Sequence, residues 1–333
     1  MAMSALSAFL LLPAALLLDR LLGEPPTRVH PVCGMGALAA IMERVFRRGP
    51  NGLRMTLAGL AACLAVVLPV GLLAALPVRL AGEMLGGAAA WTVCVVVVSL
   101  CLAPRCLDEH ARRVALPLEQ GDLEAARRAV SMLVGRDPQQ LDAHGVARAC
   151  VESVGENLTD GILSTLFWAA AGLLLAGLPG AAALAACHRA ANVLDAMWGK
   201  LNETYRCFGT AAARLDDVLN WCPARLALPC IVLAAALLPG LDARACRRVG
   251  WRDRHAHESP NSAWSEAAFA GALDLRLGGP AWYGPLYRDH PWLGDGTPLA
   301  TARHIRQAVR LMWGSLLVFA TLASLLLAAV ACI

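Results

Sequence analysis

The sequence predicts an all-α, polytopic membrane protein with about five to seven transmembrane or re-entrant helices and a helical cytoplasmic region. Hydrophobic residues make up 58% of the 333 residues and charged residues only 16%, which is too apolar for an ordinary soluble domain. Uncharged runs recur along the chain, and most reach the roughly 18 to 20 residues that cross a hydrocarbon core of about 30 Å. Arginines lie between these runs, which favours a cytoplasmic side for the segments that carry them.

The chain is expected to form one integral membrane domain, residues 1 to 333, in the cell membrane. We predict spans near residues 3 to 22, 56 to 78, 84 to 103, 162 to 187, 224 to 241 and 311 to 332. Charged residues at 79 to 83 predict a tight turn between the second and third spans. The fourth run contains Leu178-Pro179-Gly180, and a broken pair of half-helices there would keep its two polar flanks on one side of the membrane.

Three polar segments separate these spans. Residues 105 to 160 predict a helical cytoplasmic loop, in which Asp122 is a good N-cap and Asp137-Pro138 starts another helix. Residues 188 to 225 and 242 to 310 are predicted to be polar loops that carry a site and also lie on the cytoplasmic side.

An acidic stripe ends the first polar segment. Glu152, Glu156 and Asp160 fall at i, i+4 and i+8 on one face of the predicted helix, with Asn157 beside them. Like charges at this spacing repel by a few tenths of a kcal/mol per pair. The stripe runs directly into a membrane span, and it therefore predicts a cationic partner such as a metal ion carrying a phosphate. A solvent-exposed acidic stripe is the alternative.

Residues 188 to 225 combine carboxylates, amides and arginines at helical spacing. Asn192 and Asp195 are i, i+3, while Asp216 or Asp217 would face Asn220. Mg²⁺ prefers hard oxygen ligands, generally one or two carboxylates completed by substrate phosphate. Planar guanidinium groups suit phosphate or carboxylate, and this segment supplies Arg189, Arg206, Arg214 and Arg225. A salt-bridged pair of surface helices is the alternative.

The third polar segment contains a turn and a helix start. Ser259-Pro260-Asn261 predicts a turn, and a helix should begin near Ser262 and reach Glu266. Free N–H groups at a helix start, flanked here by His257 and Asn261, favour an anion, although an ordinary capped helix start is the alternative. No P-loop pattern is present. The basic residues are interspersed with acids and interrupted by spans, which argues against nucleic acid as a partner.

Four polar segments together resemble one family, the adenosylcobinamide-phosphate synthases called CobD or CbiB in cobalamin biosynthesis. The segments are residues 18 to 31, 151 to 161, 192 to 225, and 257 to 273 with 277 to 280. Each is weak alone. Their order, spacing and interleaving with apolar runs cover nearly the whole chain, and jointly they are specific.

The resemblance implies an ATP-dependent, Mg²⁺-assisted amide ligase. Adenosylcobyric acid would be joined to (R)-1-amino-2-propanol or its O-phosphate, giving adenosylcobinamide or its phosphate. ATP and Mg²⁺ are the implied cofactors. The implied partners are these two substrates, the lipid bilayer and other enzymes of the corrinoid pathway.

Site residues follow from the resemblance position by position. Catalytic acids or bases would be Glu152, Glu156, Asp160, Asp216 and Asp217, of which Glu156, Asp160, Asp216 and Asp217 are the candidate Mg²⁺ ligands. Substrate and phosphate would be held by Asn157, Asn192, Asp195, Asn202, Arg206, Arg214, Asn220, Arg225, His257, Ser259, Asn261 and Glu266.

A transporter or binding subunit for a corrinoid or another anionic solute is the alternative function. Transporters usually place ionisable groups inside their spans, often on broken helices. The uncharged runs of this sequence carry no acids or bases, and the polar residues lie between them, which favours the enzyme.

Overall fold

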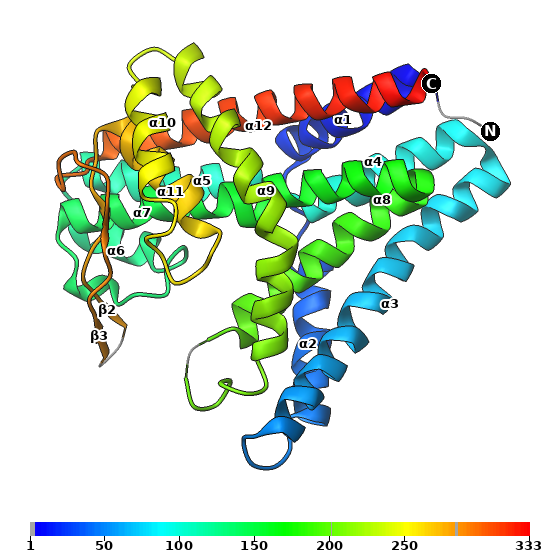
Figure 1. Cartoon of the computed structure of the whole chain (residues 1–333), viewed down its shortest axis with the longest axis horizontal. Helices are drawn as coiled ribbons and strands as arrows, with labels where there is room; N and C mark the ends of the chain where they lie inside the picture. The colour runs from blue at the N-terminus through cyan, green and yellow to red at the C-terminus, as the bar shows by residue number, and fades with distance from the viewer. Residues whose placement is uncertain (1–3, 201, 284–285) are drawn as a thin grey trace. The chain divides into compact units, whose positions relative to one another are not determined.

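The computed structural model describes residues 4–200, 202–283 and 286–333 (Figure 1). Within these residues, six helical segments are long and apolar enough to cross a membrane: Ala5–Leu22, Leu53–Leu85, Gly87–Glu119, Ala143–Trp198, Thr210–Leu237 and Ala302–Ala331. This confirms the predicted all-α, polytopic class. By its internal contacts the chain forms two compact units. Unit 1 contains Met1–Ala103, Ser164–Asn220 and Ala320–Ile333, and unit 2 contains Pro104–Leu163 and Trp221–Phe319.

Unit 1 is built around two long helices. Its elements are α1 (Ala5–Leu22), α2 (Pro31–Phe46), α3 (Leu53–Leu85), α4 (Gly87–Cys101), α8 (Ser164–Trp198), the first part of α9 (Thr210–Leu237) and the end of α12 (Ala302–Ala331). Helix α3 packs against α8, α4 and α2. The predicted turn at residues 79 to 83 is wrong, because Arg79 and Glu83 form an i, i+4 ion pair of 2.8 Å within α3. The chain turns instead at Gly86, whose φ of 91° suits glycine.

Helix α8 is broken in its middle. Ala176 and Gly177 have non-helical backbone angles, with φ of 68° at Gly177. The two halves fold back on each other, because a Cβ atom at Gly172 would lie only 2.2 Å from the carbonyl oxygen of Gly180. Thr165 and His188 are 23 residues apart, yet their side chains are 3.0 Å apart. The chain therefore enters and leaves this helical hairpin at the same end, as a re-entrant pair of half-helices requires.

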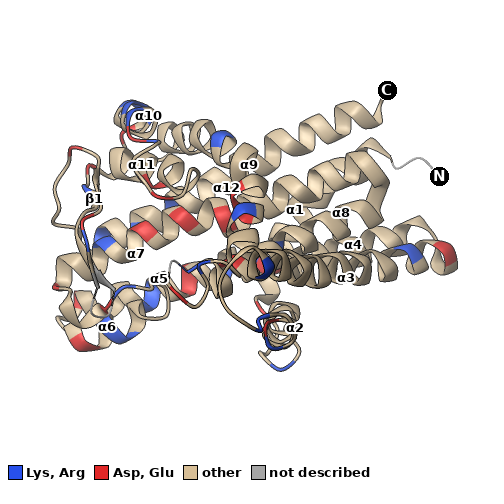
Figure 2. Ribbon diagram, turned by 60° about the horizontal axis from the view of Figure 1, so that its bottom comes forward, with Lys and Arg blue, Asp and Glu red and all other residues tan. Residues whose placement is uncertain are grey.

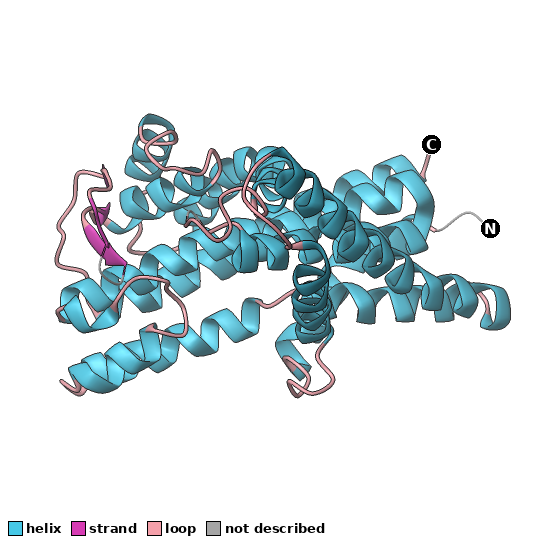
Figure 3. Ribbon diagram, turned by 90° about the horizontal axis from the view of Figure 1, so that it is seen from below, coloured by secondary structure: helices cyan, strands magenta, loops and turns pink. Residues whose placement is uncertain are grey.

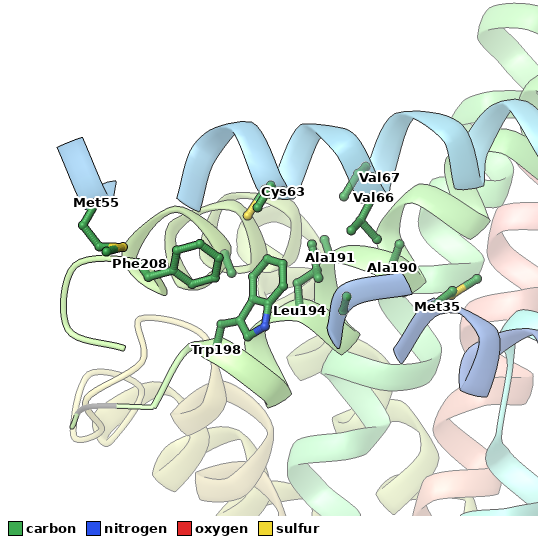
Figure 4. Close-up of a cluster of buried hydrophobic side chains, with 13 residues drawn as sticks. Met35, Met55, Cys63, Val66, Val67, Ala190, Ala191, Leu194, Trp198 and Phe208 are labelled. Atoms are coloured by element: carbon green, nitrogen blue, oxygen red, sulfur yellow. The ribbon is translucent and has the colours of Figure 1, made fainter. Parts of the chain in front are cut away.

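A buried apolar cluster joins α2, α3, α8 and the segment before α9 (Figure 4). Trp198, at the end of α8, and Phe208 point toward Cys63 of α3, with their ring centroids 4.9 Å apart. A side chain at Gly59 would meet the backbone of Phe208 at 2.0 Å. Close packing of this kind fixes the end of α8 and the start of α9. These two helix ends carry polar residues between 188 and 220.

Unit 2 contains shorter helices. They are α5 (Pro104–Glu119), α6 (Leu123–Val130), the 3₁₀ turn η1 (Pro138–Gln140), α7 (Ala143–Asn157), the π-turn η2 (Leu158–Leu163), α10 (Ala243–Arg252) and α11 (Ser262–Leu273), with the remaining parts of α9 and α12. The predicted caps are confirmed, since Asp122 accepts from the N–H of Ala125 at 2.9 Å and Asp137 from that of Gln139 at 3.0 Å. Asp142 caps α7 by accepting from Gly145 at 2.6 Å.

Short strands follow α11 in unit 2 (Figure 3). Strand β1 (Leu277–Gly278) pairs antiparallel with β4 (Trp292–Leu293), and β2 (Ala281–Tyr283) with β3 (Leu286–Arg288). No strands were predicted from the sequence in this segment. Gly278 has φ of 72°, and a Cβ there would lie 2.7 Å from the carbonyl oxygen of Pro291, which explains why this bend takes glycine.

Candidate functional site

A buried chain of hydrogen bonds in unit 1 starts at Thr165 and ends at Asp216. The Thr165 hydroxyl is 3.0 Å from Nδ1 of His188, and Nε2 of His188 is 3.1 Å from Oδ1 of Asn220. The amide nitrogen of Asn220 donates to Oδ2 of Asp216 at 2.8 Å. All four side chains are buried. The carboxylate accepts from the Asn220 nitrogen, so the amide oxygen faces His188, whose Nε2 must carry the proton.

Two more polar side chains from α8 act on the Asp216 carboxylate. The Asn192 amide forms a hydrogen bond with it, and the Asp195 carboxylate acts on it electrostatically. Asp195 is itself fitted against the end of α8, because a Cβ at Gly199 would lie 1.9 Å from its Oδ1 atom. We call Thr165, His188, Asn192, Asp195, Asp216 and Asn220 the Asp216 cluster. The predicted i, i+4 relation between Asp216 and Asn220 is confirmed, although both lie on helix α9 rather than in a loop.

The donor set of the Asp216 cluster fits Mg²⁺. The carboxylates of Asp216 and Asp195 supply hard oxygen atoms. Oδ1 of Asp216 is buried and has no hydrogen-bond partner, and a buried carboxylate oxygen of this kind is costly without a cation or donor. Among the described residues no group of three or more His, Cys, Asp or Glu could hold a metal ion by itself. Substrate phosphate would therefore have to complete the coordination, as is usual for Mg²⁺.

A second polar cluster lies in unit 2, where α7 packs against α11. Glu152 and Glu156 of α7 act electrostatically on Glu266 of α11, which is buried. The two helices approach closely, because a Cβ at Gly155 would lie 3.6 Å from the Cα atom of Glu266. We call Arg136, Glu152, Glu156, His257 and Glu266 the Glu266 cluster; Figure 2 shows acidic and basic residues together along α7.

The surroundings of Glu266 favour its protonated form. Burial raises the pKa of Glu266 well above its usual range, and the carboxylates of Glu156 and Glu152 raise it further, while Arg136 opposes them. His257 lies beside Glu156. A proton retained between neighbouring carboxylates is typical of sites that exchange protons with a substrate.

Glu152 is tied to the protein through both carboxylate oxygens. Oε2 accepts from Arg136, and Oε1 accepts from the backbone N–H of Gly278 at 2.7 Å. These contacts suit a residue that positions Arg136 and β1. Asp160 does not continue the predicted i+8 ladder, because it lies in the π-turn η2, where the α-helical repeat is interrupted.

Arg225 and Asn261 form a third polar contact, also in unit 2. Arg225 donates to Oδ1 of Asn261 at 3.0 Å and lies over the rings of Trp221 and Trp264, at 4.3 and 5.1 Å from their centroids. The helix start at Ser262 is confirmed. Before it, Nδ1 of His257 accepts from the N–H of Ser259 at 3.0 Å, which orders the predicted turn.

The remaining predicted residues are more exposed. Asn157 is exposed and donates to the carbonyl of Ser153, and Arg214 is paired with Asp217 at 3.7 Å. Asn202 and Arg206 are exposed in the segment before α9.

Sequence reasoning missed His188, Thr165 and Arg136. The available signal was His188 itself, a titratable residue placed directly after an uncharged run.

Comparison with known proteins gives one consistent result. A family model described as CobD/Cbib protein matches residues 12–312. The cobalamin biosynthesis protein CobD of Klebsiella pneumoniae is 42% identical over 299 residues, covering 90% of this chain and 91% of the relative. CobD of Citrobacter koseri is 41% identical and CbiB of Salmonella typhimurium 39% identical, each over 96% of both chains. No solved structure matches.

Proposed function

This chain belongs to the CobD/CbiB family and is an enzyme of cobalamin biosynthesis, and we propose that it is an ATP-dependent amide ligase. In this proposal it joins a propionate carboxylate of adenosylcobyric acid to (R)-1-amino-2-propanol or its O-phosphate. The observation that carries the proposal is the Asp216 cluster, in which a buried carboxylate is held by Asn220 and has one oxygen without a hydrogen-bond partner.

The reaction divides into two balanced steps. A carboxylate is a poor acyl donor, so its oxygen first attacks the γ-phosphorus of ATP; ADP leaves and an acyl phosphate forms. The amine nitrogen then attacks the acyl carbon, phosphate leaves with the bonding electron pair, and the amine loses a proton. The first step needs cations near the phosphates, and the second needs a base for the amine proton.

The residues divide between these needs. The carboxylates of Asp216 and Asp195 would hold Mg²⁺, which would neutralise charge on the phosphates. Asn220 keeps the Asp216 carboxylate in one orientation, because its amide nitrogen donates to Asp216 while His188 fixes its amide oxygen. Glu156 is the proposed base, since it lies beside His257 and next to the neutral Glu266. The guanidinium group of Arg225 lies over two indole rings and offers paired N–H donors to a phosphate or carboxylate.

Direct assay tests this proposal. Purified protein in detergent is supplied with adenosylcobyric acid, the amine in either form, ATP and Mg²⁺, and the corrinoid product and ADP are measured. We expect amide product and ADP in equal amounts, and a loss of at least about 100-fold in the Asp216→Asn variant, a typical cost for a group that stabilises transferred charge. Arg113→Gln, on an arginine side chain that is 66% exposed, is the matched control. No product with either amine would overturn the proposal.

One observation favours a second candidate, a corrinoid transporter. The broken helix α8 resembles the discontinuous helices of many secondary transporters. Uptake of labelled adenosylcobyric acid into proteoliposomes without ATP would support transport. The ligase proposal predicts no accumulation above that of empty vesicles.

A further inference from the structure

A polar cavity of about 340 Å³ lies in unit 2 at the start of α7. Its charged and polar lining comes from Arg136, Asp137, Gln140, Asp142 and Arg148, and Pro280 and Ala281, before and in β2, also line it. The volume is at the lower end of the range for ligand pockets, about 300 to 1,000 Å³. It suits a small molecule and is too small for a corrinoid ring system.

The cavity holds two guanidinium groups that share one carboxylate. Arg136 donates to Oε2 of Glu152, and Nε of Arg148 is 4.0 Å from Oε1 of the same side chain. Oε1 is already engaged by the N–H of Gly278. The Glu152 carboxylate thus brings the two guanidinium groups together at the cavity.

Arg148 has a donor prepared for a ligand. Its side chain is only 16% exposed. One terminal nitrogen donates to the carbonyl of Pro298 at 3.1 Å, and the guanidinium lies over Trp292. Its Nε atom is buried and has no hydrogen-bond partner. The carbonyl and the ring fix the plane of the fork, which is the arrangement that favours an anion with several oxygens.

Two carboxylates line the same cavity. Asp137 and Asp142 each use Oδ1 to cap a helical turn, accepting from Gln139 at 3.0 Å and from Gly145 at 2.6 Å. Capping by one oxygen fixes these side chains and leaves their negative charge at the cavity. The cavity is thus lined by both cations and anions, which matches a small molecule that itself carries both charges.

We infer that this cavity binds a small phosphate monoester that also carries an ammonium group, with Arg136 and Arg148 on the phosphate and Asp137 and Asp142 on the ammonium. The inference rests on the proposed function and deepens it: the cavity is then the binding site of the phosphorylated amine substrate. Arg136, Arg148 and the two aspartates would decide between the phosphorylated and the free amine.

Calorimetric titration of the full chain in detergent, without ATP or corrinoid, tests this site. The probes are (R)-1-amino-2-propanol O-phosphate, the free amine and inorganic phosphate. We expect the phosphorylated amine to bind at least about tenfold more tightly than either other probe, because it alone satisfies both charges. Equal affinity for the phosphorylated amine and inorganic phosphate would overturn the inference.

Variants separate the two halves of the cavity. Arg148→Gln should weaken both phosphate-bearing probes by about tenfold or more, the usual effect of losing a charge-assisted hydrogen bond. The double variant Asp137→Asn with Asp142→Asn keeps good N-caps and should weaken the two amine probes while leaving inorganic phosphate unchanged. Arg113→Gln should bind like the unaltered protein. Unchanged affinity in Arg148→Gln would also overturn the inference.

A measurement on the unaltered protein guards against a variant that does not fold. Phenylglyoxal modifies accessible guanidinium groups, and peptide mass spectrometry reads the extent at Arg136 and Arg148. The phosphorylated amine should protect both arginines and leave Arg113 unprotected; no protection at either would count against the site. Binding without amide formation would sink the ligase proposal alone. Amide formation with an unchanged KM for the amine in Arg148→Gln would sink the site alone.

Discussion

The side-chain amide of Asn220 donates to Oδ2 of Asp216 over 2.8 Å, one helical turn away on α9. Its oxygen accepts from Nε2 of His188 at 3.1 Å. Asn220 is therefore the only member of this chain of hydrogen bonds, among the described residues, that contacts both the histidine and the carboxylate. Its two contacts fix how Asp216 is presented.

Replacing Asn220 should cost stability as well as activity. Asn220→Ala leaves a buried donor on His188 and a buried carboxylate on Asp216, at about 1 to 3 kcal/mol each. We expect the free energy of unfolding to fall by roughly 2 to 6 kcal/mol, measured by denaturation in mixed micelles. Asn202→Ala, at an exposed position, should change it by less than about 1 kcal/mol. An Asn220→Ala variant with an unchanged free energy of unfolding would contradict the structural role assigned to this amide.

Glu266 predicts a specific pH dependence. Its pKa is raised in the folded protein, so the unfolded chain loses this proton at lower pH than the folded chain does. The free energy of unfolding should therefore fall as pH rises from the ordinary glutamate pKa, about 4.3, toward the raised value, by at most about 1.4 kcal/mol per pH unit.

Glu266→Gln should remove that slope and be more stable than the unaltered protein at pH 7. Thermal unfolding in EDTA from pH 5 to 8 measures the difference between the two proteins. Parallel curves across this range would contradict the assignment of a retained proton to Glu266.

The helical hairpin of α8 depends on close contact between two glycines. A Cβ at Gly172 would lie 2.2 Å from the carbonyl oxygen of Gly180, so Gly172→Val should destabilise the protein by about 1 to 3 kcal/mol or more. Gly87→Ala is the control, since nothing lies within 4 Å of a Cβ there. Thermal unfolding that ranks Gly87→Ala as the more damaging change would refute the hairpin contact.

The cytoplasmic placement of the polar segments can be tested at Cys222. Its side chain is exposed, two residues after Asn220. In a variant whose other exposed cysteines, Cys33 and Cys332, are serine, a membrane-impermeant maleimide should label Cys222 in inverted vesicles and not in intact cells. Cys150 is buried and should resist labelling from both sides. Labelling of Cys222 in intact cells would reverse the predicted orientation.

Local features were predictable from the sequence. The caps at Asp122 and Asp137 and the helix start at Ser262 depend on side chains within a few residues of the backbone they bind. The Asp216–Asn220 contact follows from a spacing of four on one helix. The turn predicted at residues 79 to 83 is wrong, because charges four residues apart can also form an ion pair along a helix.

Long-range partners were not predictable. Glu152 accepts from Gly278, 126 residues away, and His188 meets Thr165 only because α8 reverses at Gly177. From the sequence alone, a single histidine next to an uncharged run is usually interpreted as an interior residue whose hydrogen bonds are satisfied. The acidic stripe on α7 was visible, but its partner Glu266 and the π-turn that displaces Asp160 depend on tertiary packing.

We propose that ATP activates the corrinoid carboxylate as an acyl phosphate. Adenosylcobyric acid labelled with ¹⁸O in its reactive carboxylate tests it most directly, with mass spectrometry of the phosphate released on amide formation. We expect one ¹⁸O atom in each inorganic phosphate formed, with ADP as the other product. Unlabelled phosphate, or ¹⁸O found in AMP, would contradict it.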